Sequence, residues 1–296
     1  GKSNAIKGFL RISADPVFST AGGFFTSSQK ICLNHSSSAA KIYYTLDGSE
    51  PDETSTLYID SIQIDTTTAV RARAYDTGSV PGKIISQTYF INVNKTLPVV
   101  SISVDPDFMW DDSIGIYVKG VNGVPGPYGD AASNFYRDWE RAANLELFDA
   151  GGVQVSNEGI GIQIEGNYTR IQAQKSFDIH YNSKYGAKKM KYAVFRSKPN
   201  VNDLYSFYLR NSGNDWKYTA SKWRGTMFKD GLVQSLSIGQ MDVDYQAYQP
   251  AAVYINGQYF GMLNIREKYN SRYIEENFPD VDANNIDLIK QIQVEP

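Results

Sequence analysis

The sequence has few of the side chains that build disulfide frameworks or zinc sites. It contains one cysteine, Cys32, and two histidines, His35 and His180. A single thiol cannot form a disulfide within the chain, and a zinc site takes about four nitrogen or sulfur ligands. These shortages exclude a disulfide scaffold and a Cys/His zinc centre.

Long apolar runs and a strong net charge are also missing. No stretch approaches the roughly 18 apolar residues of a membrane-spanning helix, so we expect no transmembrane segment. A signal peptide is lacking too, but we interpret Gly1 as a processed N-terminus, so this does not indicate the compartment. With 29 Lys and Arg against 32 Asp and Glu, the net charge of −3 argues against a nucleic-acid partner.

Tyrosine, in contrast, is abundant. The 296 residues include 21 Tyr, 14 Phe and 4 Trp, which favours strands and half-exposed surfaces. The 24 Gly and 11 Pro are an ordinary share for folded protein and exclude collagen-like or disordered structure. The length predicts two domains.

The first predicted domain, residues 1–96, has the pattern of an all-β, immunoglobulin-like sandwich. Short runs rich in β-forming residues occur at 39–46, 61–65, 69–75 and 86–92, with turn-forming clusters between them. Short strands at this spacing are typical of such a sandwich.

Two strings in this domain permit a comparison with a known module. Residues 44–51 read Tyr-Thr-Leu-Asp-Gly-Ser-Glu-Pro, and residues 70–75 read Val-Arg-Ala-Arg-Ala-Tyr. Over most of residues 10–92 the chain resembles the small C-terminal β-sandwich of chitobiases and β-hexosaminidases. That module is accessory, so the resemblance implies an extracytoplasmic protein (secreted, periplasmic or cell surface). It does not imply a glycoside hydrolase, for which no carboxylate pair stands out.

The second predicted domain, residues 97–296, mixes strands with helices. Its clearest signals are alternating isoleucines at 159–165 and a hairpin centred on Asn256-Gly257. We therefore predict an α+β domain. The other expected strands lie at 143–148 and 175–181, and the expected helices at about 222–237 and 266–278.

Positive charge is concentrated in this domain. Between Arg170 and Lys198 the chain has eight basic residues and one acid, Asp178, which gives a local charge of +7. This segment is either a solvated face or a site for an anion such as phosphate. The basic residues are Arg170, Lys175, Lys184, Lys188, Lys189, Lys191, Arg196 and Lys198.

The turn at the start of this segment favours the second alternative, an anion site. Gly166 and Asn167 follow the isoleucine strand and can direct backbone N–H groups at an anion, while Arg170 and Lys175 add charge. Lys175 has the strand parity of Phe177, so it lies beside the predicted buried face. The alternative is a plain hairpin whose lysine reaches solvent along its own chain.

The other sequence motifs give little evidence for a function. Gly159, Gly161 and Gly166 do not match a dinucleotide fingerprint, and neither a Walker loop nor a G-x-S-x-G string is present. Residues 280–284 have the oxygen spacing of a calcium loop but lack its turn glycine and closing glutamate. We expect an ordinary loop there.

A second resemblance covers essentially all of residues 97–290. Strings in a shared order, each weak alone, are together similar to the spore-coat CotH kinase family. They lie at 97–105, 115–120, 139–141, 145–149, 159–166, 174–177 (Gln-Lys-Ser-Phe), 183–186, 209–215 (Leu-Arg-Asn-Ser-Gly-Asn-Asp), 254–261 (Tyr-Ile-Asn-Gly-Gln-Tyr-Phe-Gly) and 266–268 (Arg-Glu-Lys).

This resemblance implies an atypical, secreted kinase-like fold that binds ATP and Mg²⁺ and phosphorylates Ser or Thr of extracytoplasmic proteins. It places Gly166, Asn167 and Arg170 at the phosphates and makes Lys175 the phosphate-binding lysine. Glu267 would be the cofactor-site partner of Lys175, with a second option on the predicted helix, Asp230. Residues 166–170 read Gly-Asn-Tyr-Thr-Arg where Gly-Asn-Ser-Ser-Arg is commoner in the family.

A larger departure concerns catalysis. In the family, the catalytic and metal-binding aspartates follow a Leu-x-Lys strand, which here corresponds to residues 288–290, and the chain stops six residues later. We therefore expect the N-terminal portion of a kinase-like domain that is inactive as this chain, with no catalytic or metal residue assigned. ATP and Mg²⁺ are implied for a longer protein, and none is expected to bind tightly here.

The alternative is a non-catalytic surface or glycan-associated binding protein. In that case the sandwich and its exposed tyrosines bind a surface glycan, and the basic segment contacts an anionic polymer. The partners that follow are an extracytoplasmic protein substrate for the first hypothesis and a surface glycan for the second.

Overall fold

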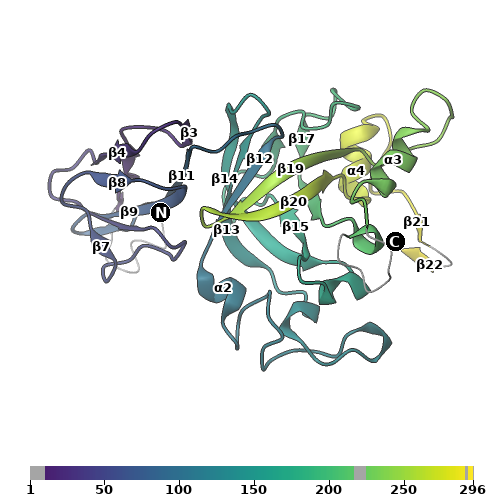
Figure 1. Ribbon diagram of the computed structural model, residues 1–296, viewed down its shortest axis with the longest axis horizontal. Helices are drawn as coiled ribbons and strands as arrows, with labels where there is room; N and C mark the ends of the chain where they lie inside the picture. The colour runs from purple at the N-terminus through teal and green to yellow at the C-terminus, as the bar shows by residue number, and fades with distance from the viewer. Residues whose placement is uncertain (1–10, 217–224, 291–292, 296) are drawn as a thin grey trace. The chain divides into compact units, whose positions relative to one another are not determined.

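The computed structural model describes residues 11–216, 225–290 and 293–295, and strands dominate it (Figure 1). Its α-helices are short: α2 (Pro106–Trp110), α3 (Lys229–Ser235) and α4 (Ser271–Asn277). The described chain is therefore mostly β with few helices. No helix in these ranges has the length and apolar character needed to cross a membrane.

Two compact units make up the chain. Unit 1 comprises the residues up to Gly115 together with Ala143–Asn157 and Ala252–Gly261. Unit 2 comprises Ile116–Ala142, Glu158–Ala251 and the residues from Met262 onward. Since each unit draws on several separate segments, the predicted boundary between residues 96 and 97 stays a prediction.

The N-terminal part of unit 1 consists of two packed layers. A five-stranded sheet in the order β3-β11-β9-β6-β7 shares one core with the β4-β8 pair, consistent with the predicted sandwich. Ile62 and Ile64 of β8 meet Val70, Ala72 and Ala74 of β9 in that core, because apolar residues alternate along both strands. The strands are β1 (Arg11–Ile12), β2 (Val17–Phe18), β3 (Gly23–Phe25), β4 (Gln29–Ile31), β5 (Leu33–Asn34), β6 (Lys41–Thr45), β7 (Thr56–Leu57), β8 (Ile62–Ile64), β9 (Thr68–Tyr75), β10 (Ser79–Val80) and β11 (Ile85–Ile91).

Unit 1 also buries one carboxyl group completely. Glu146 accepts hydrogen bonds from the Thr88 backbone N–H (3.0 Å) and from Gln154 Nε2 (2.9 Å), and the Thr88 hydroxyl contacts it too. Burial raises the pKa of Glu146 to about 7, although these three hydrogen bonds act in the opposite direction. Neutral donors alone satisfy this acid.

The long strands after residue 97 close into a barrel in the order β12-β13-β14-β15-β18-β20-β19. Ile160, Ile162 and Ile164 of β14 are fully or almost fully buried, as the alternating isoleucines predicted. The strands of the barrel are β12 (Val99–Val104), β13 (Arg141–Phe148), β14 (Gln154–Glu165), β15 (Ser176–His180), β18 (Ser206–Arg210), β19 (Tyr248–Ile255) and β20 (Gln258–Arg266). Short pairs are formed by β16 (Met190–Lys191) with β17 (Asp203–Leu204) and by β21 (Leu288–Lys290) with β22 (Gln293–Glu295).

In unit 2, the neighbouring barrel strands β15, β18 and β20 have one apolar face and one polar face. Asp178 of β15 pairs in register with Tyr208 of β18, and Tyr208 pairs with Arg266 of β20. Since facing residues in a ladder point to the same side, these side chains share one face, opposite Phe177 and Ile265. This polar face supports the charged groups described below.

Both predicted helices are shorter than expected. Of the helix predicted at 222–237, residues 222–224 lie outside the described residues, and α3 covers only Lys229–Ser235. The helix predicted at 266–278 begins at Ser271, because Arg266 still pairs in β20 and the Asn270 side chain caps α4 by accepting from Tyr273 N. The second domain is thus richer in strands than we predicted, and its kinase-like character stays a prediction.

Candidate functional site

The predicted phosphate-facing turn joins β14 to β15. Gly166 has φ +110°, and a Cβ there would lie 2.4 Å from Thr169 Oγ1, so only glycine fits without strain. Asn167 starts a short 3₁₀ turn over Tyr168–Ile171, in which the Arg170 N–H donates to Asn167 O. The segment is therefore a compact helical turn and not a two-residue hairpin.

Lys175 lies under this turn, with 4% of its surface exposed. Its Nζ donates to the backbone oxygens of Arg170 (2.6 Å) and Gln172 (2.9 Å), and it lies 4.1 Å from the Phe135 ring centroid and 5.2 Å from that of Tyr117. Within the described residues no carboxylate contacts it. Burial lowers the pKa of Lys175 to about 8, because its partners are neutral dipoles and rings.

Arg170 folds back over the same turn. Its Nε donates to Gly166 O, and its guanidinium also meets Phe135 O at 3.4 Å and the carboxylate of Asp138 at 3.0 Å. The Asp138 side chain is 76% exposed, so water screens this ion pair and makes it weak. The guanidinium therefore lies at the turn, and a more strongly binding anion could replace Asp138 as its partner.

A buried asparagine fixes the chain between the turn and β15. Asn211 donates through Nδ2 to Gln172 Oε1 (2.7 Å) and Gln174 O (2.6 Å), and its Oδ1 accepts from Ser176 Oγ (3.0 Å). The Tyr117 hydroxyl accepts from Lys175 N at 3.0 Å. Asn211 lies in the 209–215 string of the resemblance, but nothing in the sequence indicated that it positions the turn.

Glu267 does not pair with Lys175, so that prediction is wrong. Its carboxylate accepts from Lys198 Nζ (2.8 Å), Ala247 N (2.6 Å) and Asn277 Nδ2 (2.9 Å). The second option fails as well, since Asp230 forms its ion pair with Arg266 at 3.2 Å.

Strand register explains the error. Leu209 of β18 pairs with both Phe177 and Ile265, so Glu267 lies level with Ile179 of β15. Lys175 is four residues back along β15, which is about 13 Å. The sequence shows which residues are charged but not the register that separates them.

Sequence reasoning also missed Lys198 as a buried residue. Its side chain is 11% exposed, its Nζ donates to the Tyr273 hydroxyl at 2.8 Å, and it lies 4.7 Å from the ring centroids of both Tyr245 and Tyr273. Burial and a hydrogen bond to Asp244 raise the pKa of Tyr273. Lys198 was one of eight basic residues in a row, and no spacing singled it out.

Carboxylates neutralise much of the basic segment. Lys184 pairs with Glu140 at 2.7 Å, Lys189 with Asp203, and Lys198 with Glu267. Lys175, by contrast, is buried among neutral groups. Within the described ranges, no three His, Cys, Asp or Glu side chains are grouped so that they could hold a metal ion.

Asp215 anchors the start of α3. It accepts from the backbone of Thr226 (2.9 Å), Phe228 (3.1 Å) and Lys229 (3.1 Å), so a carboxylate faces the helix N-terminus. Burial alone would raise the pKa of Asp215, but hydrogen bonds from Thr226 and Lys229 lower it to about 2. This acid is a structural cap.

Comparison with known families gives two matches. Residues 20–86 match the chitobiase/beta-hexosaminidase C-terminal domain, and residues 162–292 match the CotH kinase protein family. No curated protein matches the chain. These two matches confirm both resemblances that the sequence motifs indicated.

Proposed function

We propose that residues from 97 onward form part of an extracytoplasmic, CotH-type Ser/Thr kinase-like protein that binds ATP at the turn between β14 and β15. The observation that carries the proposal is Lys175, a buried lysine that no carboxylate of the described residues contacts, within the segment that matches the CotH kinase family. A buried ammonium needs an anion, and here a phosphate would be that anion.

The residues at the turn suit a triphosphate. Lys175 donates to two carbonyl oxygens that can be exchanged for phosphate oxygens, and Arg170 is held only by neutral carbonyls and an exposed carboxylate. ATP with Mg²⁺ supplies the transferable phosphoryl group. The chain's own contribution is positioning and charge neutralisation, which phosphoryl transfer mainly requires.

Glu267 has a different role in this proposal. It neutralises Lys198 and accepts hydrogen bonds from Asn277 and the backbone of Ala247. We therefore assign it to stabilising the segment after β20 and not to binding the nucleotide. The nucleotide-binding residues we propose are Gly166, Asn167, Arg170 and Lys175. That this chain alone transfers no phosphoryl group stays a prediction.

The second candidate is a non-catalytic surface or glycan-associated binding protein. The match of residues 20–86 to the chitobiase/beta-hexosaminidase C-terminal domain favours it, as does the extracytoplasmic setting that we propose for both candidates. It differs from the first in requiring no ATP.

Calorimetric titration of the 296-residue protein with Mg·ATP separates the two candidates. We expect weak binding, whose affinity falls at least tenfold in Lys175→Ala and only slightly in Lys175→Arg. Lys184→Ala is the matched control, because it removes one charge from the same segment at an exposed ion pair. Absence of ATP binding, or equal binding by Lys175→Ala and the parent, would overturn the nucleotide proposal and favour the binding protein.

A further inference from the structure

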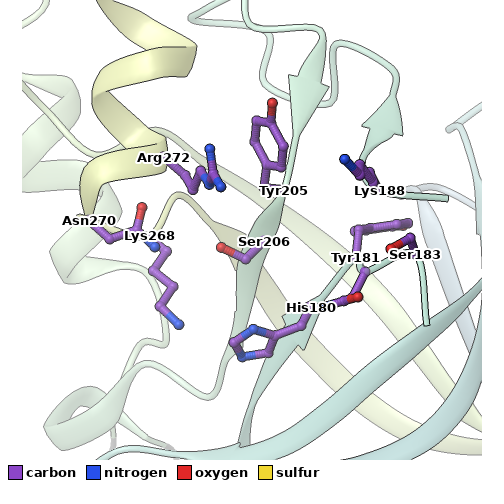
Figure 2. Close-up of a pocket in the computed structure, with 10 residues that line it drawn as sticks. His180, Tyr181, Ser183, Lys188, Tyr205, Ser206, Lys268, Asn270 and Arg272 are labelled. Carbon is purple, nitrogen blue, oxygen red and sulfur yellow. The ribbon is translucent and has the colours of Figure 1, made fainter. Parts of the chain in front are cut away.

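A polar cavity of about 490 Å³ lies in unit 2 among the ends of β15, β18 and β20 and the start of α4 (Figure 2). His180 and Ser206 project from neighbouring strands, Lys268 and Asn270 come from the segment after β20, and Arg272 belongs to α4. The volume is in the range of pockets that bind small molecules and exceeds the need of a bare phosphate ion.

The lining is cationic. It includes Lys188, Lys268 and Arg272 together with His180, and no carboxylate belongs to it. Lys268 and Arg272 each have an acidic partner that is not part of the lining, Asp178 and Glu275 respectively. Lys188 is exposed and has no ion pair or hydrogen bond within the described residues, so the cavity keeps a positive excess.

A buried acceptor lies directly behind this wall. Asp178 is 5% exposed, and its Oδ2 contacts Lys268 Nζ (2.5 Å) and His180 Nε2 (3.1 Å), both from lining residues. Its Oδ1 is buried without a hydrogen-bond partner, and so is His180 Nε2, which approaches Asp178 at an angle that makes no hydrogen bond. Buried polar atoms nearly always find partners, so these two atoms show that the wall behind the cavity contains an unpaired acceptor and an unpaired imidazole nitrogen.

We infer that this cavity binds a small hydroxylated phosphate ester of the sugar-phosphate kind. Its phosphate meets Lys188, Lys268 and Arg272, and its hydroxyls meet Ser206 and His180, which also line the cavity. A neutral sugar leaves the positive excess unmatched, and inorganic phosphate leaves the hydroxyl-binding groups unmatched.

The cavity is separate from the proposed ATP turn and does not rest on it. Lys175 immediately precedes β15 and His180 ends it, so five residues of extended chain, about 16 Å, separate them. The two sites therefore use opposite ends of β15 and different cations.

The test is calorimetric titration of the 296-residue protein with glucose 6-phosphate, glucose and inorganic phosphate. We expect glucose 6-phosphate to bind at least tenfold more tightly than either of the other probes. The double variant Lys188→Ala/Arg272→Ala should lose at least tenfold in affinity. Both residues are exposed, so the variant should unfold at the parent's urea midpoint.

Two controls assign the binding to this cavity. Lys184→Ala removes a charge from the same segment outside the lining, and Lys175→Ala removes the lysine of the turn; both should bind glucose 6-phosphate as the parent does. Equal affinity for glucose, equal affinity for inorganic phosphate, loss of binding in Lys175→Ala, or no binding at all would each overturn the inference. Failure of ATP binding alone would leave it intact.

Discussion

Two lysines in unit 2 are buried in similar surroundings but neutralised in different ways. Lys175 and Lys198 each lie against two aromatic rings. Lys198 has a carboxylate at 2.8 Å, from Glu267, whereas the Nζ of Lys175 meets only backbone oxygens. Both lysines face aromatic rings, so the main difference between the two sites is the anion.

This difference separates a structural lysine from one available to a ligand. A buried ion pair holds both charges in place, and removing one partner leaves the other uncompensated. Lys175 contacts carbonyl dipoles and no neutralising carboxylate among the described residues, which is consistent with its lowered pKa of about 8. Four measurements can break or sharpen this comparison.

The largest expected effect is on the charge-paired lysine. Glu267→Gln leaves the buried Lys198 with only the more distant and exposed carboxylate of Asp244, at 3.8 Å, among the described residues. We therefore expect a loss of about 3 kcal/mol in the free energy of unfolding, measured by urea denaturation. The double variant Glu267→Gln/Lys198→Met should recover part of that loss. A loss below about 1 kcal/mol would show that Glu267 does not neutralise Lys198 and would remove the contrast.

The next effect is a pH dependence specific to Lys175. The pKa of Lys175 is lowered from 10.5 to about 8 in the folded protein, so between these values the unfolded chain binds more protons than the folded one. The free energy of unfolding should therefore gain up to about 1.4 kcal/mol per pH unit from this group as the pH rises above 8. Below pH 8 both states are protonated and the contribution is constant.

Urea midpoints at pH 7.5, 8.5 and 9.5 test this for the parent and for Lys175→Met. The stability difference between the two proteins should shift in favour of the parent as the pH rises. Parallel profiles would mean that the lysine is not desolvated. Mg·ATP should weaken this trend in the parent, because a bound phosphate stabilises the charged lysine.

A smaller effect is expected for Lys175→Met at pH 7. The change removes two hydrogen bonds but also a desolvated charge, so the free energy of unfolding should change by no more than about 1 kcal/mol. Lys198→Met leaves Glu267 buried without its cation, so the loss in the free energy of unfolding should be clearly larger in the same urea titration. Equal losses in the two variants would contradict the distinction between the two sites.

The smallest effect concerns the tyrosines beside each lysine. Tyr117→Phe removes the hydroxyl that accepts from Lys175 N and donates to Ala173 O, and should cost about 0.5 kcal/mol. Tyr245→Phe removes one hydrogen bond to Ser197 O beside a lysine already held by its ion pair, and should cost less. Thermal denaturation resolves the order, and the reverse order would show that Tyr117 does not fix the turn.

Local sequence patterns predicted several of the longer strands of this protein. The alternating isoleucines place β14, and Asn256-Gly257 places the turn between β19 and β20. Both motif-based resemblances are confirmed by family matches. Helix ends were predicted less well, because Arg266 is held in β20 by pairing with a distant strand, which no local period reveals.

The predicted site divides in the same way. The sequence by itself determined which residues form the turn at Gly166 and that Lys175 lies at the buried edge of a strand, since both follow from residue type and period-two alternation. Only the tertiary structure decided that Glu267 pairs with Lys198 and that Lys175 is left among neutral groups. The register of β15, β18 and β20 joins residues far apart in the chain, so it determines which opposite charges meet.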